Sequence, residues 1–286
     1  MPGSLPAASG PVHRQTMVDD QVAVQLWVPD ESAPRASERP VVLALHGWTD
    51  GGAVFAPMAG ALGDVCDVVA PDAPGHGGTQ WKGSERFSFD GVIPSALKVM
   101  DALPRLVGDD RPLVLLGHSM GALTAARLAA ARPDGVGWVI LEEPPRRAFL
   151  ARRDVRRDMA SLRRVQQLAE DDRIALLANS VDWTDEELRL WAQTKATARA
   201  DVLGTLRDWG EPLSATLPRV RCPVTLLLGR DGLSETSPRR ARRYAARSGR
   251  PVEVVRLAGG HSPRREDLAG YVSVLRQILA RSVPVR

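Results

Sequence analysis

Short, largely apolar runs recur along most of this chain and alternate with longer segments of mixed polarity. A continuous apolar run of strand length is typical of a strand buried on both faces, as in a parallel sheet. The segments between the runs have the apolar spacing of amphipathic helices. This alternation predicts an α/β protein with a mostly parallel, doubly wound sheet. The runs are residues 41–45, 65–70, 113–116, 136–141, 223–228 and 251–257.

The first part of the chain has a different period. Residues 21–28 alternate between apolar and polar positions, which indicates a half-buried strand. We expect residues 12–18 to pair with it as an antiparallel edge hairpin that turns at Asp19 and Asp20. Helices are expected at residues 53–62, 89–106, 122–131, 239–248 and 267–281.

The stretch from residue 146 to residue 217 has no strand-like run and reads as a set of helices rich in arginine and tryptophan. One of these helices is expected to begin at Thr184 as N-cap, with Glu187 completing a capping box. We therefore predict a core formed by residues 1–145 and 218–286, with residues 146–217 inserted into it as a helical cap.

The most informative motif is Gly117-His-Ser-Met-Gly121, which lies between an apolar run and an Ala/Leu-rich segment. Gly-x-Ser-x-Gly between a strand and a helix is typical of a nucleophile elbow, a sharp turn that exposes the serine hydroxyl. The two glycines let the strand and helix backbones approach closely. The pattern makes Ser119 the candidate nucleophile, with the positive end of a helix dipole behind it.

In this context the chain resembles the α/β-hydrolase family, in order from about Val41 to Val274. His46-Gly-Trp48 resembles the family's oxyanion loop, and residues 71–79 resemble its Asp-x-x-Gly-His-Gly-x-Ser/Thr loop. The resemblance implies the α/β-hydrolase fold, with a helical cap over the active site. It also implies a serine nucleophile, a histidine base and an acid, brought together from distant loops.

The resemblance assigns the oxyanion hole to the backbone N–H groups of Trp48 and Met120. Such a hole needs two donors directed at the oxygen that becomes negative in the tetrahedral intermediate. His261 follows two glycines after the last predicted strand, matches the family's terminal histidine loop, and is the expected base. His46 and His76 are expected to be structural and to hold their loops by hydrogen bonds.

Several carboxylates could orient the base. The usual family position, three residues past the glycine after the strand at 224–228, holds a glycine in this chain. Asp231 lies one residue earlier on a glycine-flanked loop and is our predicted acid, while Glu235 lies a little later. Some relatives place the acid at the end of the preceding core strand, where this chain has Glu142 and Glu143. The sequence leaves all four open.

Composition and charge limit the classes of protein, partner and location that fit this chain. Of the 286 residues, 44% are hydrophobic and 25% charged, as in ordinary globular proteins. The net charge of +4 is carried almost entirely by arginines interspersed with acids, so no nucleic-acid partner is expected. The chain has no membrane-length apolar run and no signal-peptide pattern at its start, and we expect a cytoplasmic protein without a membrane partner. The two cysteines, Cys66 and Cys222, are expected to be buried thiols, and a homo-oligomer is left open.

Together these features predict a serine hydrolase that cleaves a carboxylic ester, lactone or thioester of a small molecule through an acyl-enzyme. We expect no cofactor and no metal, because the sequence has neither a nucleotide-binding motif nor metal-ligand spacing. Alternatives on the same fold are a C–C bond hydrolase, an acyltransferase or a peracid-forming enzyme. An alternative of another class is a receptor that binds a small ligand without turnover.

The cap arginines have two interpretations. Asp154 and Asp158 lie among them at helical spacing, so a solvated, ion-paired face is the simpler one. In the other, one or two of the arginines point inward and hold a carboxylate or phosphate of the substrate.

Overall fold

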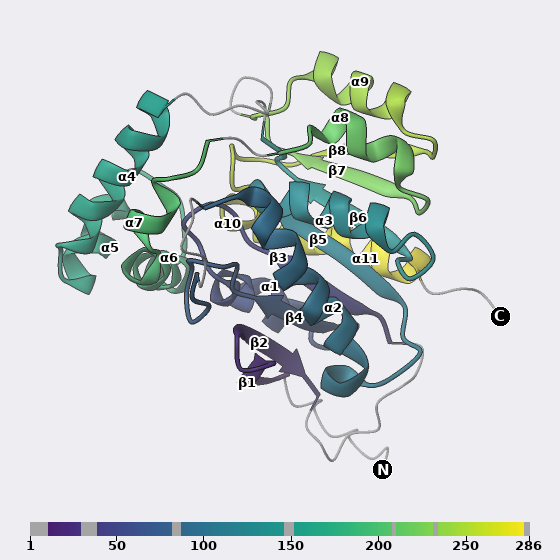
Figure 1. Cartoon of the computed structure of the whole chain (residues 1–286), viewed down its shortest axis with the longest axis horizontal. Coiled ribbons are helices and arrows are strands. Elements are labelled where there is room, and N and C mark those ends of the chain that lie inside the picture. The colour runs from purple at the N-terminus through teal and green to yellow at the C-terminus, as the bar shows by residue number, and fades with distance from the viewer. Residues whose placement is uncertain are drawn as a thin grey trace, which may run out of the picture.

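The computed structural model describes residues 11–29, 39–81, 87–145, 152–207, 210–230 and 234–282. Within these ranges one eight-stranded sheet runs through the molecule in the order β1-β2-β4-β3-β5-β6-β7-β8 (Figure 1). Neighbouring strands from β4 to β8 are parallel, whereas β2 is antiparallel to both β1 and β4. The predicted mostly parallel, doubly wound sheet is confirmed. The strands are β1 (Val12–Val18), β2 (Val22–Val28), β3 (Val41–Leu45), β4 (Asp67–Pro71), β5 (Leu113–His118), β6 (Trp138–Glu142), β7 (Val224–Leu228) and β8 (Val252–Arg256).

The edge hairpin forms where the alternating pattern predicts it. Val18 pairs with Val22, and Asp19 and Asp20 have φ of 51° and 52°. Two successive residues with positive φ give the tight turn whose twist matches a hairpin, and aspartate tolerates this conformation. β1 exposes every second residue over most of its length, whereas β2 is buried throughout between β1 and β4. The hairpin therefore closes one edge of the sheet.

Side chains of the central strands alternate between two apolar layers. In β3, Leu43 and Leu45 pack on one side, while Val42 and Ala44 pack on the other. Buried residues of α2, α3 and α9 belong to the first layer, and those of α1 and α11 to the second. The sheet is thus covered on both faces, as continuous apolar strands require. These helices are α1 (Ala56–Ala61), α2 (Val92–Val107), α3 (Met120–Ala131), α9 (Pro238–Arg247) and α11 (Leu268–Ser282).

Shorter helices complete the core. The helices expected at 53–62 and 89–106 each begin as a 3₁₀ turn, η1 (Gly52–Phe55) and η2 (Phe89–Gly91), before the α-helix proper. A four-residue helix, α10 (Pro263–Glu266), follows β8. The two cysteines are free and buried, as expected.

Helices α4 to α7 lie together beside the sheet, away from the helices that cover its faces (Figure 1). We call this group the cap. The next helix, α8 (Leu213–Thr216), lies beside α9, and Arg127 Nη2 of α3 donates to Glu211 O at 2.7 Å, so the chain has rejoined the core by residue 211. The predicted domain limits at 145 and 217 stay a prediction. The cap helices are α4 (Arg152–Gln166), α5 (Glu170–Ala178), α6 (Asp185–Thr197) and α7 (Ala200–Leu203).

At the start of α6, one half of the predicted capping box forms and the other half does not. Thr184 is the N-cap, and its Oγ1 accepts a hydrogen bond from Glu187 N at 3.3 Å. The Glu187 carboxylate does not complete the expected capping box. It is buried and pairs instead with Arg264 and Arg265 of the core, because a buried carboxylate is better stabilised by two guanidinium groups than by one backbone N–H.

Candidate active site

The turn at Ser119 is as sharp as the motif predicts. β5 ends one residue before Ser119 and α3 begins one residue after it. Ser119 has φ 51° and ψ −112°, a conformation seldom adopted by a residue with a side chain. A Cβ on Gly117 would collide with the backbone of Gly121, and a Cβ on Gly121 would collide with the end of β3. Only glycine fits at both positions, and this close packing holds the strained serine at the tip of the turn.

The loop after β3 lies directly against this turn. A Cβ on Gly47 would be 2.7 Å from His118 Nδ1 and 3.5 Å from Ser119 Cβ, so the loop can pass here only without a side chain. Trp48 comes next and lines the same cavity as Ser119. Met120, the first residue of α3, has an N–H for which the helix offers no acceptor. Both predicted oxyanion donors therefore belong to the segments that meet at the nucleophile.

His46 and His76 hold this loop from behind. His46 Nε2 accepts a hydrogen bond from Ala73 N at 2.9 Å, and His76 Nε2 accepts one from Thr49 N at 3.2 Å. Burial lowers the pKa of both histidines, that of His76 to about 3, so both are neutral at pH 7. Neither lines the cavity at Ser119. Their geometry is that of loop supports, as the sequence indicates.

His261 lies on the loop after β8 and faces a carboxylate at the end of β6. Its Nδ1 is 3.7 Å from Oε2 of Glu143, whose side chain is fully buried. Burial disfavours the charged imidazole, but the carboxylates around it, with Glu143 the strongest, outweigh that effect and raise the pKa of His261. The imidazole is therefore paired on its Nδ1 side, as the base of a catalytic triad must be.

Glu143 is held by the loop in which the sequence predicted the acid. Gly229 N and Ser234 Oγ donate to its Oε1 at 2.7 and 2.6 Å, and Glu235 N donates to its Oε2 at 2.6 Å. Burial alone would raise the pKa of Glu143, but these donors and His261 lower it, so the group is ionised. The loop after β7 thus surrounds a carboxylate that comes from β6. Asp231, our predicted acid, lies outside the described residues.

Glu142 points away from His261, although it is adjacent to Glu143. Glu142 is the last residue of β6, and its side chain lies on the face of the sheet that α11 covers. There its Oε2 accepts a hydrogen bond from Tyr271 OH at 3.0 Å. Its Oε1 accepts one from Arg264 N at 3.4 Å. Burial, the largest effect, raises the pKa of Glu142. Of the two neighbouring glutamates, Glu143 is therefore the one placed to orient the imidazole.

His118 is a site residue that the sequence reasoning missed. Its Nε2 donates to the backbone oxygen of His261 at 2.9 Å, and the two rings lie 5.0 Å apart. Because a carbonyl only accepts, the proton of His118 is on Nε2. Burial lowers its pKa to about 3, so the ring stays neutral. His118 connects the nucleophile turn to the base loop, and a large polar residue inside the elbow motif was the visible signal.

Ser119 and His261 open into a common cavity of about 630 Å³ between the core and the cap. Its walls combine indole rings with side chains of both charges, so it suits a ligand with an apolar body and at least one polar group. The cap contributes Asp154, Arg157, Asp158, Trp183, Trp191 and Lys195, and the core contributes Trp48, Asp50, His118, Pro145, Glu235, Ser262 and Arg265.

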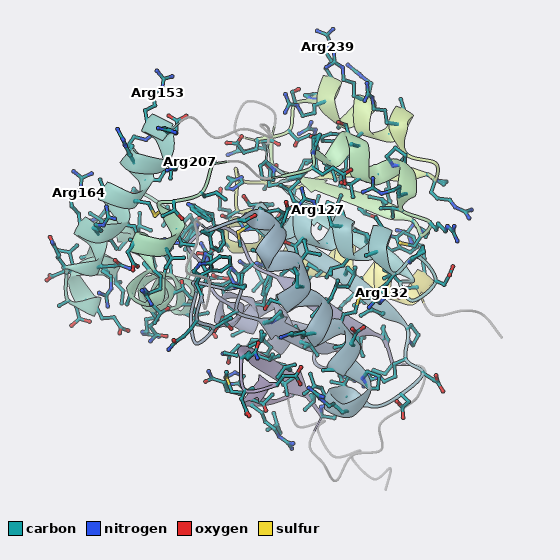
Figure 2. The ribbon with its side chains drawn as sticks, in the orientation of Figure 1. Arg127, Arg132, Arg153, Arg164, Arg207 and Arg239 are labelled. Carbon is teal, nitrogen blue, oxygen red and sulfur yellow. The ribbon has the colours of Figure 1, made fainter. Side chains whose placement is uncertain are left out.

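Arginines of α4 mainly face solvent. Figure 2 shows Arg153 and Arg164 extending outward from α4. The Arg153 side chain is 86% exposed and lies 3.7 Å from Asp154. Arg157, which also lines the cavity, is 73% exposed and pairs with Asp158 at 3.4 Å. These contacts agree with the solvated, ion-paired interpretation of this helix.

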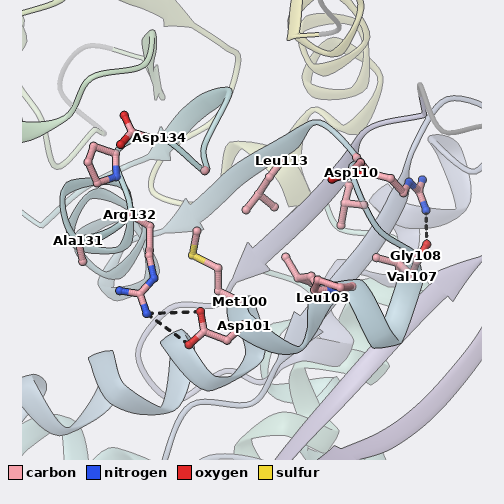
Figure 3. Close-up of a pocket in the computed structure, with 15 residues that line it drawn as sticks. Met100, Asp101, Leu103, Val107, Gly108, Asp110, Leu113, Ala131, Arg132 and Asp134 are labelled. Atoms are coloured by element: carbon pink, nitrogen blue, oxygen red, sulfur yellow. Dashed lines mark hydrogen bonds and ion pairs between the residues drawn. The ribbon is translucent and has the colours of Figure 1, made fainter.

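A second cavity, of about 600 Å³, lies at the amino ends of the parallel strands, opposite the end that carries Ser119 (Figure 3). It is lined by the first residues of β3 and β5, Val41 and Leu113, and by the end of α2. Its charged side chains include Arg132, which pairs with Asp101 across its edge. Its lining contains no serine, cysteine or histidine, so it offers no hydroxyl or thiol nucleophile paired with a histidine base.

The described ranges of the chain contain no group of three or more His, Cys, Asp or Glu side chains suited to a metal ion. None of the helices described there combines the length and the apolar character needed to cross a bilayer.

A serine on a strained strand–helix turn, with a paired histidine after the last strand of a parallel sheet, is the arrangement of an α/β hydrolase. The sequence matches a family model described as "Alpha/beta hydrolase family" over residues 41–274. The chain therefore belongs to the α/β-hydrolase family, as its motifs indicate, and is a hydrolase.

The similar proteins include several esterases. A pimeloyl-[acyl-carrier protein] methyl ester esterase of Xanthomonas axonopodis pv. citri is 30% identical over 78% of this chain and 81% of its own length. The lipase LipV of Mycobacterium tuberculosis is 34% identical, over 36% of each chain. Among solved structures, a thioesterase domain from the curacin biosynthetic pathway superposes with a TM-score of 0.69 at 21% identity, covering 96% of this chain and 100% of that one. This last likeness shows the fold alone.

Proposed function

We propose that this protein is a serine esterase that cleaves a carboxylic ester or thioester of a small molecule through an acyl-enzyme. The observation that carries the proposal is that the strained Ser119 and the paired His261 line one cavity, while the ionised Glu143 lies buried beside His261. The names of the relatives, an esterase and a lipase, support ester substrates.

In the proposed reaction His261 Nε2 takes the Ser119 proton while Ser119 Oγ forms a bond to the substrate carbonyl carbon. The carbonyl π electrons move to its oxygen, which the N–H groups of Trp48 and Met120 stabilise. The tetrahedral intermediate collapses, and the leaving alcohol or thiol takes the proton from His261. Water, deprotonated by the same histidine, then attacks the acyl-enzyme, and the carboxylic acid leaves with Ser119 restored.

We assign the acid to Glu143. A triad acid has to be a buried carboxylate next to Nδ1 of the base, where it fixes the tautomer and stabilises the imidazolium. Glu143 meets each requirement, since it is fully buried, ionised and 3.7 Å from His261 Nδ1. The loop that was expected to supply the acid contributes three hydrogen-bond donors to Glu143, which supports this choice over Asp231.

The decisive experiment compares the wild-type protein with Ser119→Ala. A fluorophosphonate probe should label the wild type at Ser119, and p-nitrophenyl esters of short acids should be turned over repeatedly. Ser119→Ala should lose the label and at least about 10⁴-fold in kcat. If folded wild-type protein neither takes the label nor turns over esters, the proposal fails. A single slow burst, together with a ligand-dependent rise in Tm, would favour a ligand-binding receptor instead.

A further inference from the structure

A lysine of the cap, Lys195, forms hydrogen bonds to a loop of the core. Lys195, near the end of α6, places its ammonium group on the loop after β3 and donates to Thr49 O and Thr49 Oγ1, both at 2.9 Å. It also donates to Asp50 Oδ1 at 2.7 Å. An ammonium group has three N–H donors, so these bonds use all of them. Lys195 is thus fully committed to the segment that follows Trp48.

That segment is under conformational strain. Thr49 has φ 63°, in the left-handed region that a β-branched residue rarely enters. Such a conformation persists only where surrounding contacts determine it. Thr49 has those contacts: its N–H donates to His76 of the core, and its carbonyl and hydroxyl accept from Lys195 of the cap. Trp48, whose N–H is a predicted oxyanion donor, is therefore followed directly by a residue that α6 helps to hold.

The contact is part of a buried ionic network that joins the loop after β3 to helices α6 and α10. Asp50 lies 3.4 Å from Arg265 Nη2 as well as 2.7 Å from Lys195. Arg265 Nε is 3.2 Å from Glu187 of α6, which also pairs with Arg264 at 3.2 Å. The two arginines lie in α10, directly after His261 and its loop. The pKa of Asp50 lies well below its usual value, because the neighbouring cations outweigh the effect of burial, so Asp50 is ionised. Burial acts in the opposite sense on two of its neighbours, raising the pKa of Glu187 and lowering that of Lys195.

We propose that Lys195 is a positioning residue, which fixes the oxyanion loop so that the Trp48 N–H points at the reacting carbonyl. The cap end of α6 is then a fixed part of the catalytic machinery. This inference rests on the proposed hydrolase function. Burial of the ions makes the contact hard to break, since removing one partner leaves another charge uncompensated. A donor that is held before the substrate arrives also has no reorganisation to make during the reaction.

Two alternative roles for Lys195 can be distinguished from positioning, one by the contacts of the lysine and the other by kinetics. A lysine nucleophile or base would need a free ammonium hydrogen directed into the cavity, but all three are bound to the loop. A lysine that bound an anionic group of the substrate would act on KM for anionic esters and leave neutral esters unaffected. A positioning lysine acts on kcat for neutral esters as well, because the oxyanion forms with every ester.

The test compares Lys195→Met with wild type on a neutral p-nitrophenyl ester. Loss of one oxyanion donor costs about 10²- to 10³-fold in kcat, and a displaced donor should cost roughly 10- to 100-fold. KM should change less than threefold, and affinity for a trifluoromethyl ketone, which forms an oxyanion adduct, should fall in parallel with kcat. Lys195→Arg, which keeps the charge, should recover part of the loss. Lys98→Met is the matched control, because Lys98 lies on α2 and donates an exposed hydrogen bond to Gln21, far from the loop after β3 in the sequence.

Hydrogen exchange tests the same contact without any turnover. Peptides covering residues 47–52 should exchange faster in Lys195→Met and unchanged in Lys98→Met, with Tm recorded for both. Unchanged exchange in this loop would overturn the inference even if the protein proved not to be an esterase. Wild-type-like kcat in Lys195→Met, or an effect confined to KM of anionic esters, would overturn it while leaving the proposed function intact. An inactive wild type would overturn the proposed function alone.

Discussion

Two cavities of nearly equal size, about 630 and 600 Å³, lie at opposite ends of the same parallel strands. At the carboxyl ends, strand termini and loops bring together a serine, a histidine and a buried carboxylate. At the amino ends, the walls combine apolar side chains with ion pairs, of which Arg132–Asp101 is exposed and Arg111–Asp67 is buried. Volume is therefore a poor guide to the site, whereas the direction of the strands is a good one, because loops at the carboxyl ends converge on one crevice.

The two ends also differ in how their polar groups are stabilised. Glu143 at the carboxyl end has three hydrogen-bond donors within 2.7 Å and no exposed side-chain surface. At the amino end Asp67 is also fully buried, but its partners are the guanidinium groups of Arg39 and Arg111. Asp101 at that end is 58% exposed and lies 3.3 Å from Arg132. A buried ion in fixed geometry is preorganised for chemistry only where it faces a group that can react, as Glu143 faces His261. An exposed pair contributes little, because water screens it.

Among the substitutions that test this comparison, the largest effect is expected from Glu143→Gln. The amide leaves the shape of the site intact but no longer stabilises the correct tautomer or the imidazolium of His261, so kcat should fall by up to about 10⁴-fold. Steady-state kinetics on a short-chain aryl ester measure this, with circular dichroism as the check on folding.

Glu142→Gln and Asp231→Asn are the matched controls. Glu142 faces Tyr271 rather than His261, so its amide should act mainly on stability, and Asp231→Asn should stay within a few-fold of wild type. If Asp231→Asn lost most of the activity while Glu143→Gln kept it, the assignment of the acid would be wrong.

The pairing of His261 with Glu143 should also be visible in the pH dependence of kcat/KM. His261 acts as a base only when neutral, and its pKa is raised by the surrounding carboxylates. Activity should therefore fall as the pH drops through a midpoint above 6.5, the ordinary value for histidine. The residual activity of Glu143→Gln should have a lower midpoint, because the charge that favours the imidazolium is gone. Equal midpoints in the two proteins would contradict the pairing.

The smallest effect is expected at the amino ends of the strands. Arg132→Ala removes an exposed ion pair with Asp101, worth less than about 1 kcal/mol of stability. Thermal unfolding should change little and kcat should stay within twofold of wild type. A loss of activity in Arg132→Ala at unchanged Tm would mean that this cavity is coupled to the site, and the contrast drawn above would have to be abandoned.

Much of the fold could be predicted from the sequence because its signals are local. Strand burial, helix spacing and the Gly117–Gly121 turn each depend on residues close together in the chain. The same holds for the hairpin at Asp19 and Asp20. The nucleophile turn was identifiable for this reason, since only glycine permits its close contacts.

The acid and the cap contacts depend on residues far apart, which a local pattern cannot reveal. Whether Glu142 or Glu143 faces the base depends on the residue at which β6 ends, and a shift of one residue reverses the answer. Lys195 lies 146 residues from Thr49 in the sequence. Glu187 was assigned to a capping box because its nearest partner in sequence was Thr184, but the folded chain offers it two arginines.

The hydrogen bond between Glu142 and Tyr271 has a consequence for how the protein is made. The two residues are 129 positions apart, so at roughly 5–20 residues per second the ribosome needs on the order of ten seconds to supply the partner. For most of that interval β6 is the edge strand of the nascent sheet, and its last residue is an acidic side chain whose partner from α11 does not yet exist. A chaperone that shields this half-built sheet should therefore raise the yield of native protein, and a gene rearranged so that α11 is translated before β6 should depend on it less.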